Sequence, residues 1–149
     1  MKELKINAIR EGTVIDHIPH NMTFKVVDIL GITDTNNIVS IATNLYSKKM
    51  RKKGLVKIGS RFLTKEEVDK IALVAPNASV NIIKNFEVTE KIKVNIPQIL
   101  NNIIKCSNPR CITNNDKVST LFHSTSSSPL KVRCHYCERC MGKEDVELL

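Results

Sequence analysis

The sequence predicts an α+β protein in two parts. Residues 1–98 are expected to form a ferredoxin-like split βαβ sandwich in the order βαββαβ, and residues 99–149 a small antiparallel β domain that binds a metal. Short stretches rich in Ile and Val alternate with two amphipathic stretches in the first part. All five cysteines lie in the second part. A domain of that size usually needs a metal or disulfides to supplement its core.

Composition narrows the class of protein. Of the 149 residues 42% are hydrophobic but only 4% aromatic, with no Trp, so the expected core is aliphatic. The chain has no apolar run near the roughly 18 residues that span a membrane, and its charged first residues do not resemble a signal peptide. We therefore expect a soluble, cytoplasmic protein without a membrane partner. In a reducing compartment, clustered cysteines favour a metal over disulfides.

The first elements are an interrupted strand and a helix. Residues 4–10 and 12–18 alternate between apolar and polar side chains and are counted as one strand broken at Gly12. Residues 21–31 have apolar side chains at near-helical spacing. Asn21 is the expected N-cap, and the glycine at position 31 can end the helix.

Two strands and the clearest helix follow. Residues 37–45 and 54–62 predict two strands joined by a basic turn. The stretch 64–75 predicts a helix, since Thr64 and Glu67 have the spacing of a capping box and a proline follows the last position. Residues 79–94 are predicted as a last strand region, and the polar stretch "NIPQILNN" after them as a linker.

The cysteines carry the strongest local signal. They form the pairs Cys106-x4-Cys111 and Cys134-x2-Cys137, 22 residues apart. Two short-spaced pairs are typical of a four-cysteine zinc site, in which four protein ligands leave no open position. The sequence thus predicts one structural Zn²⁺ per chain. Spacing alone leaves an alternative open, because Cys137-x2-Cys140 has the same spacing as Cys134-x2-Cys137, and His135 is a further possible ligand.

Three further stretches of the sequence are distinctive: "REGTVIDHIP" at 10–19, "NLYSKKMRKKGLVKI" at 44–58 and "ALVAPNASVNIIKNFEV" at 72–88. Together with the cysteine pattern, they make the chain resemble a known family, the regulatory chain of aspartate carbamoyltransferase. The resemblance covers essentially all 149 residues. The resemblance implies four metal ligands at Cys106, Cys111, Cys134 and Cys137, and it makes Cys140 a departure from the family pattern.

What the resemblance implies about function goes beyond composition. Family members are not catalytic; their N-terminal domain binds nucleotide effectors such as CTP, ATP and UTP. Their zinc domain docks onto the catalytic chain, and regulatory dimers bridge catalytic trimers in an enzyme of pyrimidine biosynthesis. Nucleotide binding thereby shifts an equilibrium at a distant active site.

The family's effector pocket can be carried over to matching positions only. These are Asn7, Ala8, Ile9, Asp16, His17, Lys53, Lys57, Asn81, Ile83, Phe86, Val88 and Lys91. The resemblance implies that backbone groups of the first strand read the base, that Asp16 meets a ribose hydroxyl, and that the histidine and lysines meet phosphates. Phe86 stands where Tyr is common and Asn7 where an acid is common.

Two other functions compete with this prediction. A zinc-ribbon nucleic-acid-binding protein would explain the formal charge of +8 and the cysteines. However, residues 1–100 carry 16 Lys and Arg against 10 Asp and Glu, and residues 101–149 carry 7 against 5. Four thiolates on one Zn²⁺ would make the second region nearly neutral, and it has few aromatic residues that could stack bases. An enzyme is disfavoured because no nucleophile and base, and no open metal site, are indicated.

Overall fold

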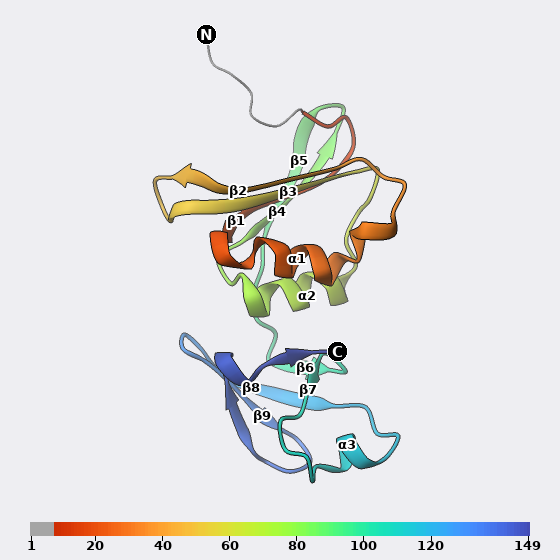
Figure 1. The fold of residues 1–149 in the computed structure, drawn as a ribbon, viewed down its shortest axis with the longest axis vertical. Helices are drawn as coiled ribbons and strands as arrows, with labels where there is room; N and C mark the ends of the chain where they lie inside the picture. Colours follow the sequence, from red (N-terminus) through yellow and green to blue (C-terminus); the bar gives the residue numbers. More distant parts are fainter. Residues whose placement is uncertain (1–7) are drawn as a thin grey trace. The chain divides into compact units, whose positions relative to one another are not determined.

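The chain folds as two compact units, which divide at Asn95 and Ile96. The computed structural model describes residues 8–149 (Figure 1). Most of the strand expected at 4–10 lies outside this range, and residues 8–10 are not in a strand. No helix in the described part of the chain is long and apolar enough to cross a membrane.

The first unit is a five-stranded antiparallel sheet covered by two helices. Its elements are β1 (Gly12–Pro19), η1 (His20–Met22), α1 (Thr23–Leu30), η2 (Ile32–Asp34), β2 (Val39–Ser47), β3 (Arg51–Gly59), α2 (Lys65–Val74), β4 (Ser79–Lys84) and β5 (Glu87–Lys93). The strand order is β2-β3-β1-β4-β5. The first four strands and both helices form the predicted split βαβ sandwich. The predicted last strand region is a hairpin, which adds β5 as an edge strand.

The helices pack on one face of this sheet only (Figure 1). Alternate residues of β3 explain why, since Val56 and Ile58 are fully buried towards the helices while Leu55 and Lys57 point to the opposite face. From α2, Ile71 is fully buried in the same core. In the described part of the chain, the opposite face of the sheet therefore carries no helix.

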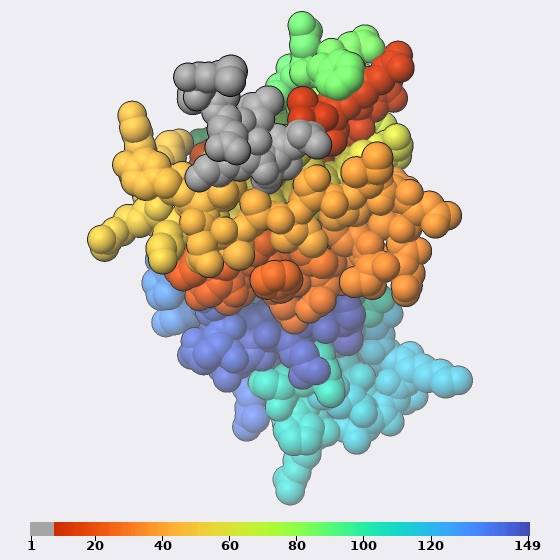
Figure 2. Space-filling view, turned by 45° about the horizontal axis from the view of Figure 1, so that its top comes forward, coloured from red at the N-terminus to blue at the C-terminus, as the bar shows by residue number. Residues whose placement is uncertain are grey.

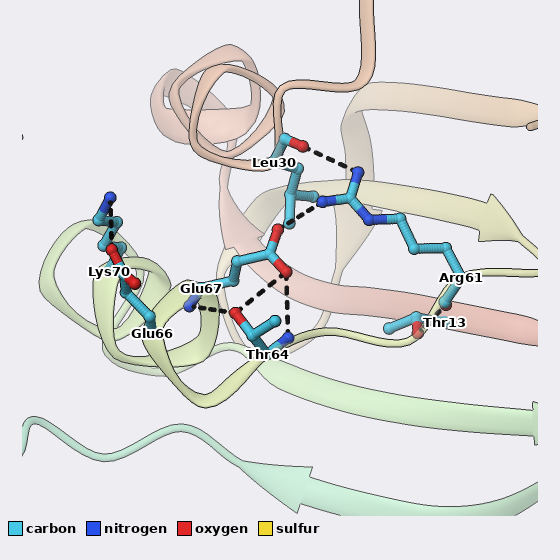
Figure 3. A network of polar contacts seen from close by, with 7 residues as sticks. All are labelled: Thr13, Leu30, Arg61, Thr64, Glu66, Glu67 and Lys70. Atoms are coloured by element: carbon cyan, nitrogen blue, oxygen red, sulfur yellow. Dashed lines mark hydrogen bonds and ion pairs between the residues drawn. The ribbon is translucent and has the colours of Figure 1, made fainter. Parts of the chain in front are cut away.

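Polar contacts fix the ends of both helices, as Figure 3 shows. Thr64 and Glu67 form the predicted capping box at the start of α2. Arg61 joins the two helices: its guanidinium donates to the Leu30 carbonyl at the end of α1 at 2.8 Å and to the Glu67 carboxylate at 2.5 Å. Through Arg61, these contacts connect the C-terminal end of α1 to the N-terminal end of α2.

The expected N-cap of α1 is wrong. The N-cap residue is Met22, which makes no side-chain capping bond, because a turn of 3-10 helix over η1 precedes α1 and moves its start. The predicted end is confirmed: Gly31 closes the helix with a left-handed backbone at φ 58°.

The second unit is built from short strands. Its elements are β6 (Ile99–Asn101), β7 (Ile104–Lys105), α3 (Ile112–Asn115), β8 (Leu121–Ser127), β9 (Leu130–Cys134), β10 (Cys140–Gly142), η3 (Lys143–Asp145) and β11 (Glu147–Leu148). A four-stranded sheet has the order β10-β9-β8-β6, and β11 pairs with β7. Part of the expected linker is thus a strand, because β6 pairs with β8 and buries Leu100.

Candidate functional site

Four cysteines of the second unit converge on one point. The sulfur atoms of Cys106, Cys111, Cys134 and Cys137 all lie within 4.8 Å of one another. The Sγ–Sγ distance is 3.6 Å between Cys106 and Cys137, and 3.7 Å between Cys111 and Cys134. A tetrahedral ion with metal–sulfur bonds of about 2.3 Å would place its ligand sulfurs about 3.8 Å apart. The four thiols therefore fit a tetrahedral metal ion such as Zn²⁺.

Tight turns present these sulfurs. In the first turn the Cys111 N–H donates to the Asn108 carbonyl at 3.0 Å, and the Asn114 side chain donates to the Cys106 carbonyl at 2.9 Å. In the second, the Glu138 N–H donates to the Cys134 carbonyl at 3.0 Å. These bonds satisfy backbone groups at the turns and fix the shape of the two knuckles.

The local environment shifts the pKa of three of the four clustered thiols. Burial raises the pKa of the Cys106 thiol to about 12 and also raises the pKa of Cys134. At Cys137 burial acts against the thiolate, but hydrogen bonds from the Arg139 backbone and the Asn108 side chain outweigh it and lower the pKa to about 7. Buried thiols of raised pKa lose their protons when a metal ion takes the protons' place.

The alternative pairing of Cys137 with Cys140 does not occur in the described structure. Cys140 begins β10, is exposed, and is not part of the four-sulfur cluster. His135 is not part of it either; its Nδ1 lies 3.1 Å from Nε2 of His123. A bound ion would cross-link the two knuckles. With four protein ligands it would leave no open position for a reactant.

A second feature is an apolar pocket of about 280 Å³ on the helix-free face of the first unit's sheet. Seven of the residues predicted to bind a nucleotide line it: Ala8, Ile9, Lys57, Asn81, Ile83, Phe86 and Val88. Phe86 lies in the β4–β5 turn and has a left-handed backbone at φ 66°, and Val88 follows within β5. The pocket's small size and apolar lining suit a planar ring.

Cations adjoin this pocket in a row across the sheet. Val14 of β1 pairs with Lys57 on one side and with Asn81 on the other, and Asn81 pairs with Lys91 of β5. Directly paired residues of adjacent strands share a face. One row of the sheet therefore places two lysines, an amide and a valine on the same face.

Asp16 and His17 lie one step further along β1. The Asp16 carboxylate is 2.8 Å from the Lys53 ammonium. Burial acts to raise the pKa of Asp16, but the Lys53 contact and the His17 N–H bond lower it below its ordinary value. His17 has a left-handed backbone at φ 60°, and the β1–β3 pairing shifts there, as at a β-bulge. Its Nδ1 lies 3.2 Å from the Ser79 hydroxyl.

The predicted effector residues thus fall into two adjoining groups. Ala8, Ile9, Lys57, Asn81, Ile83, Phe86 and Val88 surround the apolar pocket, while Asp16, His17, Lys53 and Lys91 lie beside it. Asn7 lies outside the described residues. Sequence reasoning missed Val14 and Leu55 in the pocket lining. The alternation of strands is the signal that could have found them, since they lie two residues from Asp16 and from Lys53 respectively.

The chain was compared with known proteins. Residues 4–95 match the family described as aspartate carbamoyltransferase regulatory chain, allosteric domain, and residues 98–147 match the metal binding domain of the same regulatory chain. Aspartate carbamoyltransferase regulatory chains from several organisms are similar over nearly the full length. That of Pyrococcus horikoshii is 54% identical over 148 residues, which are 98% of this chain and 97% of the relative.

Relatives with lower identity give the same result. The regulatory chain of Thermococcus onnurineus is 48% identical, with 98% of this chain and 97% of the relative covered. That of Phocaeicola vulgatus is 46% identical, with 98% and 94% covered. With both units matched, the chain belongs to the family of aspartate carbamoyltransferase regulatory chains, and is a non-catalytic, allosteric subunit with a metal-binding domain.

Proposed function

We propose that the first unit binds nucleoside triphosphates and that their binding modulates aspartate carbamoyltransferase catalytic chains. CTP and ATP are the expected effectors, with UTP a third candidate. The observation that carries this proposal is the apolar pocket bordered by cations on the helix-free face of the sheet. A nucleotide has the same division, with a flat apolar base at one end and a strongly anionic chain at the other. Residues 1–98 are the proposed effector domain.

Each group of residues has a proposed role. Backbone groups of Ala8 and Ile9 read the base edge, and Phe86 packs against the base or sugar. The lysines at positions 53, 57 and 91, together with His17, bind the phosphates, because charge-assisted hydrogen bonds to anions are the strongest that a protein makes. The Asp16 carboxylate accepts a hydrogen bond from a ribose hydroxyl, and its lowered pKa keeps it ionised.

In the second unit we propose Zn²⁺ as the metal, one per chain. Thiolate ligands in a tetrahedral arrangement favour zinc, and the sulfur separations of 3.6 and 3.7 Å suit its bond length. The ion's role is to hold the knuckles of residues 99–149, the surface that we propose docks onto a catalytic chain. Four reduced thiols also agree with a cytoplasmic location.

Self-association into a regulatory dimer is the third part of the proposal. Within residues 8–149, strand β2 is an edge of the sheet, and the outer side of its backbone can extend a sheet in a second copy. Apolar side chains lie exposed along it, including Ile38 just before the strand and Tyr46 within it, which are 78% and 79% exposed. Figure 2 shows this orange-to-yellow segment at the molecular surface.

The test is assembly followed by kinetics. The chain is co-purified with a catalytic chain of aspartate carbamoyltransferase, and aspartate saturation is measured with and without CTP or ATP. The expected result is one zinc per regulatory chain and a nucleotide-dependent shift of the saturation curve. A complex that forms with zinc but shows no nucleotide binding by calorimetry would refute the effector role and leave the docking role intact.

A further inference from the structure

Two histidines of the second unit lie side by side, apart from both candidate sites. Nε2 of His123 and Nδ1 of His135 are 3.1 Å apart, and the ring centroids are separated by 5.3 Å with the ring planes tilted by 46°. His135 is exposed and His123 is half-buried, so solvent can reach the pair. Neither the four-sulfur cluster nor the pocket of the proposed nucleotide site includes these two imidazoles.

Strand register explains why the two rings meet. Phe122 of β8 pairs with Cys134 of β9, and both side chains are fully buried. Because side chains alternate along a strand, the next residues, His123 and His135, lie on the opposite face of the sheet. The His135 N–H donates to the Leu121 carbonyl at 2.8 Å, which extends the β8–β9 pairing one step beyond the end of β9. The two histidines are therefore diagonal neighbours on one face, within reach of each other's rings.

The surroundings of the pair hold it in place. His123 pairs with Ile99 of β6 on one side and with Arg133 of β9 on the other. Tyr136 packs edge-on against the His135 ring at a centroid distance of 5.2 Å. A ligand that both rings share thus has to immobilise little of the chain, which lowers the entropy cost of binding.

The spacing of the two nitrogens suits a divalent transition ion. Imidazole nitrogens bind such ions at about 2.0–2.1 Å. With the separation of 3.1 Å kept, an ion at that distance from both nitrogens would have them about 100° apart. This angle lies between the roughly 90° of square or octahedral coordination and the roughly 109° of tetrahedral coordination. Imidazole is a preferred ligand of zinc, nickel and copper.

The protons of the pair do not prevent such binding. At 3.1 Å, one ring donates its N–H to the facing nitrogen of the other ring. A neutral imidazole can carry its proton on either nitrogen, so the donor ring can shift this proton to its outward nitrogen. Both facing nitrogens then offer a lone pair to the ion, and neither ring has to lose a proton to solution.

We propose that His123 and His135 form a second metal site, for a divalent transition ion such as Zn²⁺ or Ni²⁺. Within residues 8–149, no third imidazole, thiol or carboxylate joins the pair in a ligand cluster, so water completes the coordination and the ion is exchangeable. His135 directly follows Cys134, a member of the four-sulfur cluster. The second ion therefore ties β8 to the knuckle of Cys134 and Cys137 and stabilises this knuckle through its binding free energy.

The experiment is calorimetric titration of the full chain with Ni²⁺, which elemental analysis distinguishes from zinc. The protein carries no histidine tag and is loaded with one equivalent of Zn²⁺. His123→Ala removes one ligand and leaves the knuckle sequence intact, and His135→Ala removes the other. His20→Ala is the matched control, because it removes an exposed histidine from the first unit.

Wild type and control are expected to bind one Ni²⁺ per chain and to retain their zinc. Each of the other two variants should bind Ni²⁺ at least about tenfold more weakly, since one of two protein ligands is lost. Hydrogen exchange measured by mass spectrometry gives a second test. Ni²⁺ should increase the protection of residues 121–138 in the wild type and the control, but not in His123→Ala.

Three results would overturn the proposal. The first is a wild type that binds no Ni²⁺, or binds it no more tightly than both alanine variants of the pair. The second is uptake of Ni²⁺ matched by release of zinc in every protein, which would place the ion at the four sulfurs. The third is loss of binding in His135→Ala alone, which would show that His123 is not a ligand.

Discussion

The two units of this chain achieve a folded core in different ways. Among the described residues, sixteen buried hydrophobic residues lie in the first unit. Ten lie in the second, and three of them are the cysteines at 106, 111 and 134. The first unit can therefore stabilise itself by aliphatic burial, whereas the second places thiols where an ordinary domain would place apolar side chains.

This difference also separates their chemistry. The first unit covers only one face of its sheet with helices, so the other face is free to carry a pocket and its cations. The second unit directs its most distinctive side chains inward, onto a single point. A ligand of the first unit should thus be exchangeable, and the ion of the second should be part of the fold.

The largest expected effect follows from removing a metal ligand. Cys111→Ser should abolish metal binding and unfold the second unit, because structural zinc contributes about 10–16 kcal/mol of apparent binding free energy in small zinc domains. Hydrogen exchange measured by mass spectrometry should show lost protection after Ile96, with protection of the first unit unchanged. Metal content is measured on the same samples.

Cys140→Ser is the matched control for that variant. It removes an exposed thiol outside the cluster, so metal content and protection should both equal those of the wild type. A Cys111→Ser protein that retains one metal ion per chain and a protected second unit would show that the four-sulfur site is not what holds this unit together.

A cavity made in the aliphatic core should destabilise the first unit alone. Ile71 of α2 is fully buried, and Ile71→Ala should destabilise the first unit by about 2–5 kcal/mol, because it leaves a cavity in an aliphatic core. Metal content should stay the same. Equal loss of protection in both units would show that they unfold as one cooperative body, which contradicts the division drawn above.

Much of the fold could be predicted because it depends on local signals. Alternation located β1, β2 and β3, and the capping box located the start of α2. Strand β5 was not predicted as a strand separate from β4. All seven of its residues are exposed, so it has no buried apolar face that would mark it in the sequence. Strand β6 was taken for a linker, since a strand of three residues has too few positions for a pattern.

The two candidate sites also differ in how far the sequence predicts them. A four-cysteine site was expected from spacing, because the ligands of each knuckle are neighbours in the sequence, and the family resemblance implied Cys134 and Cys137 as the second pair. The pocket lined by His17, Lys49, Lys91 and Lys93 was not expected, because the pairing of strands that are distant in the sequence brings these residues to one place. Neither the shift in register nor the left-handed backbone at His17 has a sequence signal such as glycine.

A smaller effect is expected on ligand binding in the first unit. Lys53→Ala should weaken CTP and ATP alike, by about 1.5–3 kcal/mol, since it removes a charge-assisted phosphate contact. It also leaves the Asp16 carboxylate without its partner and so repels the phosphates. The double variant Asp16→Asn/Lys53→Ala should therefore bind more tightly than Lys53→Ala alone. Calorimetry that ranks the double variant weaker would contradict this role of the ion pair.

The smallest expected effect is the pH dependence of the first unit's stability. Because the folded pKa of Asp16 lies below its ordinary value of 3.8, the ionised form is favoured by folding. The resulting stabilisation is fully present above pH 3.8 and is lost as the pH falls through the lowered folded value. For a pair whose side chains are about one fifth exposed, we expect no more than about 1 kcal/mol.

Denaturant melts of the wild type and Asp16→Asn should diverge at pH 6 and converge towards pH 2.5. The second unit has no share in this difference, so hydrogen exchange after Ile96 should be the same in both proteins at each pH. A difference between the two proteins that persists unchanged to pH 2.5 would mean that Asp16 stabilises the fold by packing, and not through its charge.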